Sequence, residues 1–269
     1  MPYRRDIIYS FDGSFEGLMC CVFESFERKE IPSEIIVGEP VQISFSEVRI
    51  IEICHEKAER VTRAIPLKIS PYAFDTVRKM FLSCAENKNL LILEFLHKGF
   101  RYGRKIENML ADDTVNAVNK AVFHCTHEAH LLKGFIRFSD YNGYLAAVIE
   151  PKNKVIPLLA AHFTDRFRNE NFLIYDRTHR MALIYFQHNT EIAENIDFEL
   201  PAANAEEEYY RELWKCFYRT IGIKERYNPR CRMNLMPKRF WSNMTEMRDE
   251  LGIEDNSQNR ITEKNERHN

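Results

Sequence analysis

The chain has 269 residues, of which 45% are hydrophobic and 29% are charged, and its formal net charge is −2. This composition is that of a globular protein, and it excludes a global attraction to nucleic acid or to anionic membranes. No apolar run approaches the roughly 20 residues needed to cross a bilayer, and no signal-peptide pattern opens the chain. Seven scattered cysteines without a CxxC motif indicate reduced thiols, and we therefore expect a cytoplasmic protein.

Strand and helix signals alternate through the first half of the chain. An apolar strand is expected over 6–11, and Ser14 is suited to cap the helix that follows it. The sequence then predicts a strand-forming region over 41–53 and helices over 54–65, from Pro71 onward, over 90–100 and over 114–132.

A short basic segment, 97–105, ends the predicted helix over 90–100. It interleaves four cations with two aromatic residues and contains no acid, a mixture that suits phosphate contact combined with base stacking. It equally suits a solvated helix end, where cations complement the helix dipole. As candidate nucleic-acid contacts we name Lys98, Arg101, Arg104 and Lys105.

Three histidines follow at steps of three residues, at His124, His127 and His130. A zinc-binding helix of the HExxH type needs its histidines four residues apart, and this spacing does not supply that motif. We therefore predict no metal site and no cofactor.

The stretch from 128 to 186 is predicted to form strand, turn, strand, helix, strand, turn, strand. The expected strands cover 134–139, 144–150, 172–176 and 181–186, and Asn142-Gly143 supplies a tight turn between the first two. The fold class is therefore α+β, with mixed helices packed around a small, mostly antiparallel sheet. We expect one domain over 1–250, with a sub-boundary near 110–128 and a disordered tail over 251–269.

The same stretch holds four candidate catalytic residues. His162, Asp165 and Arg166 share one face of the predicted helix, and Asp176 ends a strand. Such a set can serve as an acid–base site in which the arginine clamps a phosphate. It can equally be an ion-pair network that fixes helix to sheet, and the sequence favours that second interpretation because it shows no nucleophile–base order.

The C-terminal part combines an amphipathic helix with a second basic segment. After a loop-like acidic region over 190–205, a helix is expected over 206–221 with Tyr210, Leu213, Trp214 and Phe217 facing inward. The segment 224–241 then carries six cations against one glutamate, a local charge of +5. It is a candidate arm that contacts the nucleic-acid backbone, through Arg226, Arg230, Arg232, Lys238 and Arg239.

Six motifs together carry a resemblance to a known family: FDGSFEG (11–17), EAHLLKGFIRF (128–138), IEP (149–151), HFTDRF (162–167), IYDRTHR (174–180) and MPKRFW (236–241). Over residues 6–246 the chain resembles a bacterial family described as a DNA metabolism protein and built on a domain of unknown function. That family is typically encoded beside a radical S-adenosylmethionine protein of DNA repair, and in some relatives the domain is fused to a uracil-DNA glycosylase-like domain. We expect no such domain after the basic segment here.

The resemblance implies an accessory protein for DNA repair or DNA modification that works with DNA and with a radical S-adenosylmethionine partner, away from membranes. This sequence has no CxxxCxxC motif, so any radical chemistry would belong to the partner. Two alternatives stay open. One is an independent enzyme that acts on nucleic acid through the four candidate catalytic residues, and the other is a scaffold without nucleic-acid contact.

Overall fold

The computed structural model describes residues 3–4, 6–39 and 47–252, which form two compact units. The N-terminal unit is Met1–His127 and the C-terminal unit is Glu128–Asn269. The division lies inside the 110–128 range expected for a sub-boundary, and the single domain over 1–250 stays a prediction. The expected tail over 251–269 lies outside the described residues apart from Leu251, which ends the last helical turn, and Gly252.

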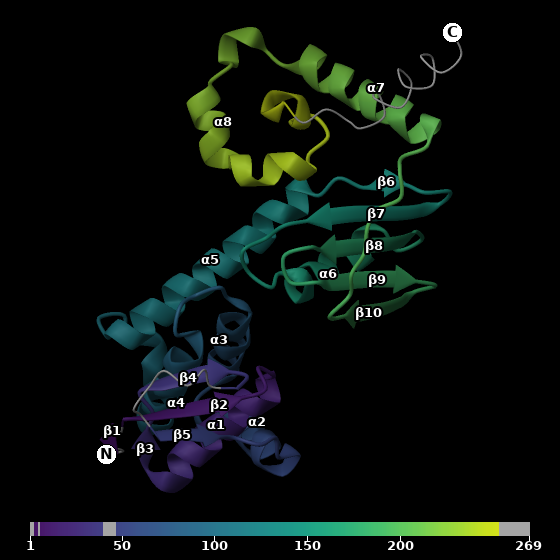
Figure 1. The fold of residues 1–269 in the computed structure, drawn as a ribbon. Coiled ribbons are helices and arrows are strands. Elements are labelled where there is room, and N and C mark those ends of the chain that lie inside the picture. The colour runs from purple at the N-terminus through teal and green to yellow at the C-terminus, as the bar shows by residue number, and fades with distance from the viewer. Residues whose placement is uncertain (1–2, 5, 40–46, 253–269) are drawn as a thin grey trace. The chain divides into compact units, whose positions relative to one another are not determined.

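The N-terminal unit combines two small parallel sheets with helices (Figure 1). Strand β2 lies between β4 and β5, and β1 pairs with β3. The elements are β1 (Tyr3–Arg4), β2 (Ile7–Phe11), α1 (Phe15–Arg28), β3 (Glu30–Ile31), β4 (Glu34–Val37), β5 (Glu47–Ile50), α2 (His55–Lys68), α3 (Pro71–Leu82), α4 (Lys88–Tyr102), the 3-10 helix η1 (Gly103–Asn108) and the first part of α5 (Asp113–Phe135).

The predicted helix cap at Ser14 is confirmed in this unit, and Ser70 caps the helix that was expected to begin at Pro71. The Ser14 hydroxyl accepts a hydrogen bond from the Gly17 N–H at 2.9 Å, and Ser70 does the same for Ala73 at 3.0 Å. Each hydroxyl satisfies a backbone donor that the first helical turn leaves without a partner, which fixes where α1 and α3 begin.

The C-terminal unit is built on a five-stranded sheet in the order β10-β9-β8-β7-β6. The sheet is antiparallel except for the pair β7 and β8, which α6 connects as a crossover helix. The elements are β6 (Ser139–Asp140), β7 (Tyr144–Ile149), α6 (Ile156–Arg166), β8 (Asn171–Asp176), β9 (Met181–Phe186), β10 (Asn189–Ala193), α7 (Ala205–Ile221), η2 (Lys224–Arg226), α8 (Pro229–Leu235), η3 (Lys238–Asn243) and η4 (Arg248–Leu251). The predicted α+β class is confirmed.

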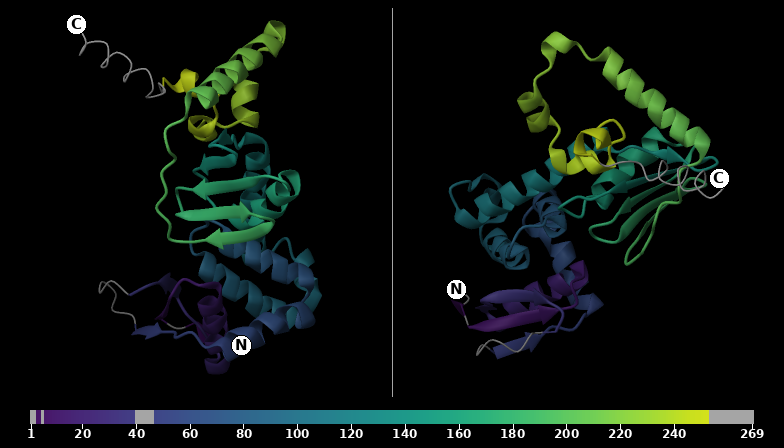
Figure 2. Two further views of the ribbon diagram at one scale, coloured as in Figure 1. Left: turned by 90° about the vertical axis from the view of Figure 1, so that its right-hand side faces the viewer. Right: turned by 45° about the horizontal axis from the view of Figure 1, so that its top comes forward.

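The two faces of this sheet are covered differently (Figure 2, left). Helix α6 lies on one face, where alternate strand residues such as Ile174 and Leu183 form a core with Leu159, Phe163 and Trp241. The segment 194–204, which we call the strap, crosses the opposite face on its way from β10 to α7 (Figure 1). We call these the core face and the strap face.

The turn at Asn142-Gly143 is confirmed. Both residues have positive φ angles, 56° and 86°, as a tight hairpin turn requires. The Gly143 N–H donates to the Asp140 side chain at 2.7 Å, which fixes the hairpin between β6 and β7.

One strand prediction in this unit is wrong, and one loop prediction is wrong at its start. The strand expected over 134–139 is reduced to β6, because α5 continues to Phe135 so that Leu132 and Phe135 can join the core. The region 190–205, expected as a loop, begins with residues 190–193 of β10, and it is irregular over 194–204 as expected. This edge strand is held by backbone pairing with β9 and exposes its polar side chains, so it shows no hydrophobic pattern.

The orientation predicted for α7 is also wrong. The four residues expected to face inward are between 40% and 58% exposed, namely Tyr210, Leu213, Trp214 and Phe217. The buried residues of α7 are instead Glu207 and Lys215. Glu207 accepts a hydrogen bond from the Asp140 backbone N–H, and Lys215 pairs with Glu212 and Asp249. Polar contacts therefore attach α7 to its unit, and much of its apolar side remains open to solvent.

No helix within the described residues combines the length and the apolar character that spanning a membrane requires.

Candidate functional site

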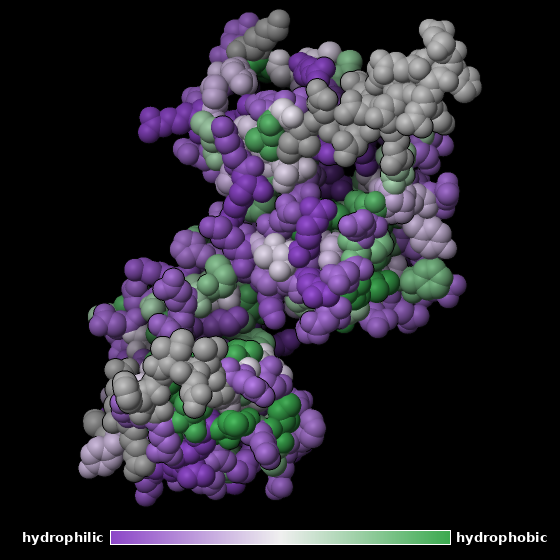
Figure 3. Space-filling model, in the orientation of Figure 1, coloured by the Kyte–Doolittle hydropathy of each residue, from purple (hydrophilic) through white to green (hydrophobic). Residues whose placement is uncertain are grey.

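The strap is fastened to the sheet by tyrosine hydroxyls. Tyr175 donates to the Ile196 carbonyl oxygen at 2.9 Å, and Tyr141 donates to that of Pro201 at 3.1 Å. Side chains of β7, β8 and β9 that point away from α6 remain accessible beside it, and Figure 3 shows hydrophobic residues gathered over the right-hand part of this face. Two cavities open there, on either side of Ala146, which lines both.

The first cavity, which we call the arginine groove, has a volume of about 360 Å³. Four arginines line it, and a single acid, Glu150, lines it with them. Small and polar residues complete the wall. The groove is lined by Arg137, Ser139, Ala146, Ala147, Val148, Glu150, Arg177, Leu200, Arg211, Ser242, Asn243, Thr245 and Arg248.

Arg137 is held in place by a buried carboxylate. Its guanidinium donates to both oxygens of Glu246, at 2.5 and 3.2 Å, and it lies over the ring of Trp214. Burial alone would raise the pKa of Glu246, but hydrogen bonds from Arg137 and from the Trp214 indole outweigh it and hold that pKa below its usual value. The ionised pair therefore fixes Arg137 at one end of the groove.

Two further arginines pair with carboxylates, Arg211 in a largely buried contact and Arg177 in an exposed one. Arg211 donates from Nε to Glu207 at 2.8 Å and from Nη2 to the Ser139 hydroxyl at 2.7 Å. Arg177 donates from Nη1 to Glu150 at 2.7 Å. A guanidinium has five N–H donors, so Arg177 and Arg211 keep others for an anion in the groove. Arg137 also donates from Nη1 to the carbonyl oxygens of Gly134 and Ile136, at 2.8 and 3.2 Å, and keeps one donor.

The second cavity, which we call the aromatic pocket, has a volume of about 260 Å³ and no charged lining residue. It is lined by Tyr141, Tyr144, Leu145, Ala146, Asn171, Phe172, Leu173, Ile184, Tyr185, Phe186, Phe198 and Pro201. The arginine groove and the aromatic pocket thus lie next to each other on the strap face.

The candidate catalytic residues of α6 do not reach these cavities. Asp165 forms an exposed ion pair with Arg168 at 2.7 Å, and Arg166 lies over the ring of Phe167. Burial, followed by the nearby charges of Lys133 and Arg166, lowers the pKa of His162. An imidazole in this setting is neutral at pH 7 and can accept a proton, and the catalytic role of the set stays a prediction.

Asp176, the fourth candidate, pairs with a histidine that was not among the candidates from the sequence. Its side chain is fully buried and accepts hydrogen bonds from the backbone N–H of His179 at 3.1 Å and from the imidazole, whose Nδ1 lies 2.6 Å away. Both residues belong to the hairpin between β8 and β9, so this pair fixes the hairpin turn that also carries Arg177.

The cations of the 97–105 segment divide into bound and exposed groups. Lys98 is bound to Asp112 at 2.5 and 2.7 Å and to Thr114, an arrangement that ties α4 to the start of α5. Arg101 lies over the Tyr102 ring, and Arg104 makes a loose, exposed contact with Glu107 at 3.6 Å. Lys105 is exposed.

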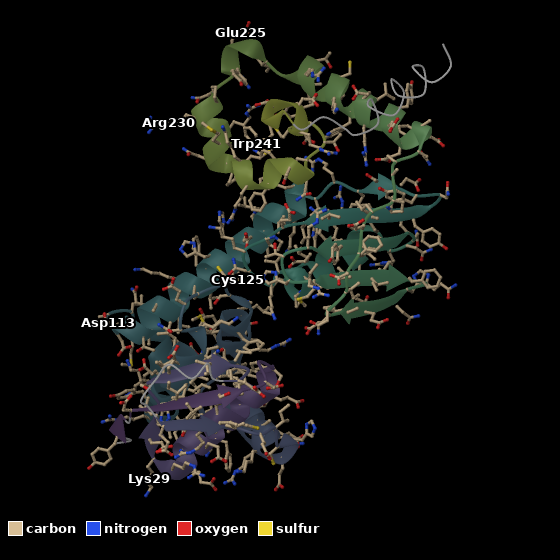
Figure 4. The ribbon with its side chains drawn as sticks, viewed as in Figure 1. Lys29, Asp113, Cys125, Glu225, Arg230 and Trp241 are labelled. Carbon is tan, nitrogen blue, oxygen red and sulfur yellow. The ribbon has the colours of Figure 1, made fainter. Side chains whose placement is uncertain are left out.

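The cations of the 224–241 segment divide in the same way. Arg232 is held by Glu250 at 2.5 and 2.7 Å, and Arg239 by the buried carboxylate of Glu128 at 3.1 Å. Of the other cations whose side chains the structure describes in this segment, Arg226, Arg230 and Lys238 are all exposed. Figure 4 shows Arg230 pointing outward from α8, whereas Trp241 is buried and donates to the Met236 carbonyl.

The histidines of α5 show no metal-binding geometry. His127 stacks on Phe123 with the ring planes 3° apart. Across the part of the chain that the structure describes, no group of three or more histidine, cysteine, aspartate or glutamate side chains is arranged to hold a metal ion.

Sequence reasoning missed the groove, and none of its four arginines was among the candidate site residues. Arg177, Arg211 and Arg248 come from a hairpin turn, from α7 and from η4. No local motif joins segments so far apart in sequence. One local signal was available, the spacing of four residues between Glu207 and Arg211, which pair on α7.

Comparison with known proteins identifies the family of the chain. The sequence model described as a domain of unknown function, DUF4130, matches residues 86–246. The match covers more than half of the 269 residues and includes the sheet, α7 and most of the groove, but not the FDGSFEG motif at 11–17. No curated protein and no solved structure matches the chain. The chain therefore belongs to the DUF4130 family of domains of unknown function.

Proposed function

We propose that the strap face binds nucleic acid and that the phosphates lie in the arginine groove. The observation that carries this proposal is the convergence of four arginines on one cavity whose lining includes a single acid. Planar guanidinium groups match the oxygens of a phosphate and can donate two parallel hydrogen bonds to it. A cationic groove of this kind offers a local attraction that the net charge of −2 does not.

The way the arginines are held supports the same proposal. Glu246 and Glu207 fix two of the four guanidinium groups before any ligand arrives, and Glu150 pairs with the more exposed Arg177. Binding therefore has little side-chain ordering to offset, which favours affinity for a phosphate backbone. The exposed side chains of Arg226, Arg230 and Lys238, in the basic segment 224–241, would add contacts to further phosphates of the bound nucleic acid.

The biological setting that we propose is DNA repair or DNA modification, with this chain as an accessory to a radical S-adenosylmethionine protein. The resemblance described above supports this setting, and the lack of a CxxxCxxC motif assigns the radical chemistry to the partner. On this proposal the chain holds the nucleic acid and the partner acts on it.

The exposed apolar side of α7 favours a protein partner as the second element of this function. Tyr210, Leu213 and Phe217 lie three or four residues apart along the helix and are between 46% and 58% exposed. A contiguous apolar stripe of this kind, on a helix attached through its polar residues, is typical of a surface that another protein covers. We assign this surface to the radical S-adenosylmethionine partner.

Binding of a fluorescent single-stranded DNA oligonucleotide, measured by anisotropy over a range of salt concentrations, tests the groove. We expect Arg177→Gln combined with Arg248→Gln to weaken binding and to reduce the slope of log K against log salt by about 1.4, which is roughly 0.7 for each phosphate that the variant no longer neutralises. Arg168→Gln is the matched control, because Arg168 is an exposed arginine that pairs with Asp165 on α6.

An unchanged affinity and slope in the double variant would overturn the assignment of phosphates to the groove. Equal reductions of affinity in the double variant and in Arg168→Gln would indicate a diffuse electrostatic effect and would overturn it as well. Thermal unfolding of each variant checks that the fold is retained.

Co-purification with the co-expressed radical S-adenosylmethionine protein, with and without nuclease, tests the partner surface. We expect Leu213→Glu with Phe217→Glu to abolish a nuclease-resistant complex. Leu67→Glu should leave that complex intact, because Leu67 is an apolar residue of α2 that is 84% exposed. A complex that survives the α7 substitutions would exclude this surface.

A further inference from the structure

The aromatic pocket offers two parallel rings at its rim. Tyr144 opens β7 and Phe186 ends β9, and both point to the strap face. Their ring centroids are 6.5 Å apart and their planes are only 12° from parallel. The side chains are 54% and 43% exposed, so much of each ring surface is open to a ligand. Exposed, parallel rings are stacking surfaces for another planar ring.

Between these rings lies a side chain with hydrogen-bond donors. Asn171, on the intervening strand β8, lines the same pocket. Its Oδ1 accepts from the Gln187 backbone N–H at 3.0 Å, which fixes the amide orientation. The amide nitrogen then provides two N–H donors, which suit a carbonyl oxygen on the edge of a base.

The pocket adjoins the arginine groove along β7. Ala146 lines both cavities, with Tyr144 on one side of it and Val148 on the other. Four residues of a β-strand span about 13 Å. An oligonucleotide of a few nucleotides can therefore reach from one cavity to the other. The volume of about 260 Å³ is smaller than that of a pocket for a drug-sized molecule, and it suits a single planar ring.

We propose that the aromatic pocket holds one unpaired base of a strand whose phosphates lie in the arginine groove, so that the substrate class is single-stranded nucleic acid. This inference rests on the proposed function. In a duplex the bases are already stacked and paired, and a base can enter a side pocket only after leaving the helix. In a single strand the base is available at once, and any base can stack on an aromatic ring.

The test compares three ligands of equal length by anisotropy: an oligothymidine strand, a strand with the same phosphates but abasic sites in place of bases, and a duplex. We expect wild type to prefer oligothymidine to the abasic strand by about 5- to 150-fold for the stacked base. Tyr144→Leu with Phe186→Leu should remove most of this preference while retaining the abasic affinity. Tyr72→Leu is the control, since Tyr72 is a 58% exposed aromatic residue of α3.

The outcomes separate the pocket from the groove. If wild type binds the abasic strand as tightly as oligothymidine, or binds the duplex more tightly than either, the base pocket is overturned while the arginine groove stands. If the leucine variant keeps the full preference, the pocket is overturned too. If wild type binds none of the three ligands, the proposed function fails and the pocket fails with it.

Discussion

The two faces of the C-terminal sheet are made from the same strands, yet one is a packed core and the other carries two open cavities. On the core face, alternate residues such as Ile174 and Leu183 are fully buried against α6. On the strap face, the intervening residues leave a cationic groove and an aromatic pocket open. Because side chains alternate along a strand, one segment can stabilise the fold through one face and present a binding surface through the other.

This difference separates effects on stability from effects on binding. A substitution on the core face should lower the free energy of unfolding without changing a contact with a ligand. A substitution on the strap face should change ligand contacts while the fold survives.

The largest expected effect is on the core face. Phe163, on α6, is 2% exposed and packs edge-on against Phe138. We expect Phe163→Ala to lower the free energy of unfolding by about 3–5 kcal/mol, because it leaves a cavity in a packed core. Phe186→Ala on the strap face should cost only about 1 kcal/mol, since that ring is already partly exposed. Urea unfolding of both variants measures the difference, and equal destabilisation would contradict the division between the faces.

A smaller effect on the free energy of unfolding is expected from Arg239, which attaches the basic segment 224–241 to the start of the C-terminal unit. Arg239 is bound to the buried carboxylate of Glu128, which also accepts from the backbone N–H groups of Lys152 and Asn153. We expect Arg239→Gln to lower the free energy of unfolding by about 1–2 kcal/mol.

The matched substitution Arg230→Gln should change stability by no more than about 0.5 kcal/mol, because Arg230 is exposed on α8. Chemical denaturation of the two variants shows whether Arg239 contributes to stability and Arg230 does not, as the geometry indicates. Equal stability of Arg239→Gln and wild type would refute the structural role of Arg239.

The smallest expected effect is a dependence on pH that comes from Glu246. Its pKa is lower in the folded protein than its ordinary value of about 4.3, because Arg137 and Trp214 donate to it. The ionised carboxylate therefore contributes stability above that ordinary pKa, and the contribution disappears as the pH falls through the lowered value.

Glu246→Gln has no such titration. We therefore expect the stability difference between wild type and this variant to be widest near neutral pH and to narrow below about pH 4.3, as followed by denaturant unfolding at several pH values. A difference that is constant with pH would show that Glu246 does not hold Arg137 as an ionised pair.

Local signals in the sequence predicted those features that depend on a few adjacent residues. The turn at Asn142-Gly143 requires positive φ angles, and the cap at Ser14 requires a side-chain acceptor. These requirements depend on the residue types at the turn and at the cap, and the structure confirms both elements.

Features that depend on distant partners could not be predicted in this way. The orientation of α7 is set by polar contacts of Glu207 and Lys215, so its apolar residues do not mark the buried side. A run of basic residues likewise does not show that Arg232 and Arg239 are occupied by Glu250 and Glu128. The arginine groove draws its lining from separate segments between 137 and 248, and only the folded chain brings them together.

Hydrogen–deuterium exchange with and without a single-stranded DNA oligonucleotide tests the central claim most directly, because it locates the ligand on the protein. We predict slower exchange in β7, in the strap over 194–204 and in 242–248, with no change in α6. Slower exchange confined to α6, or to no part of the C-terminal unit, would contradict the assignment of nucleic-acid binding to the strap face.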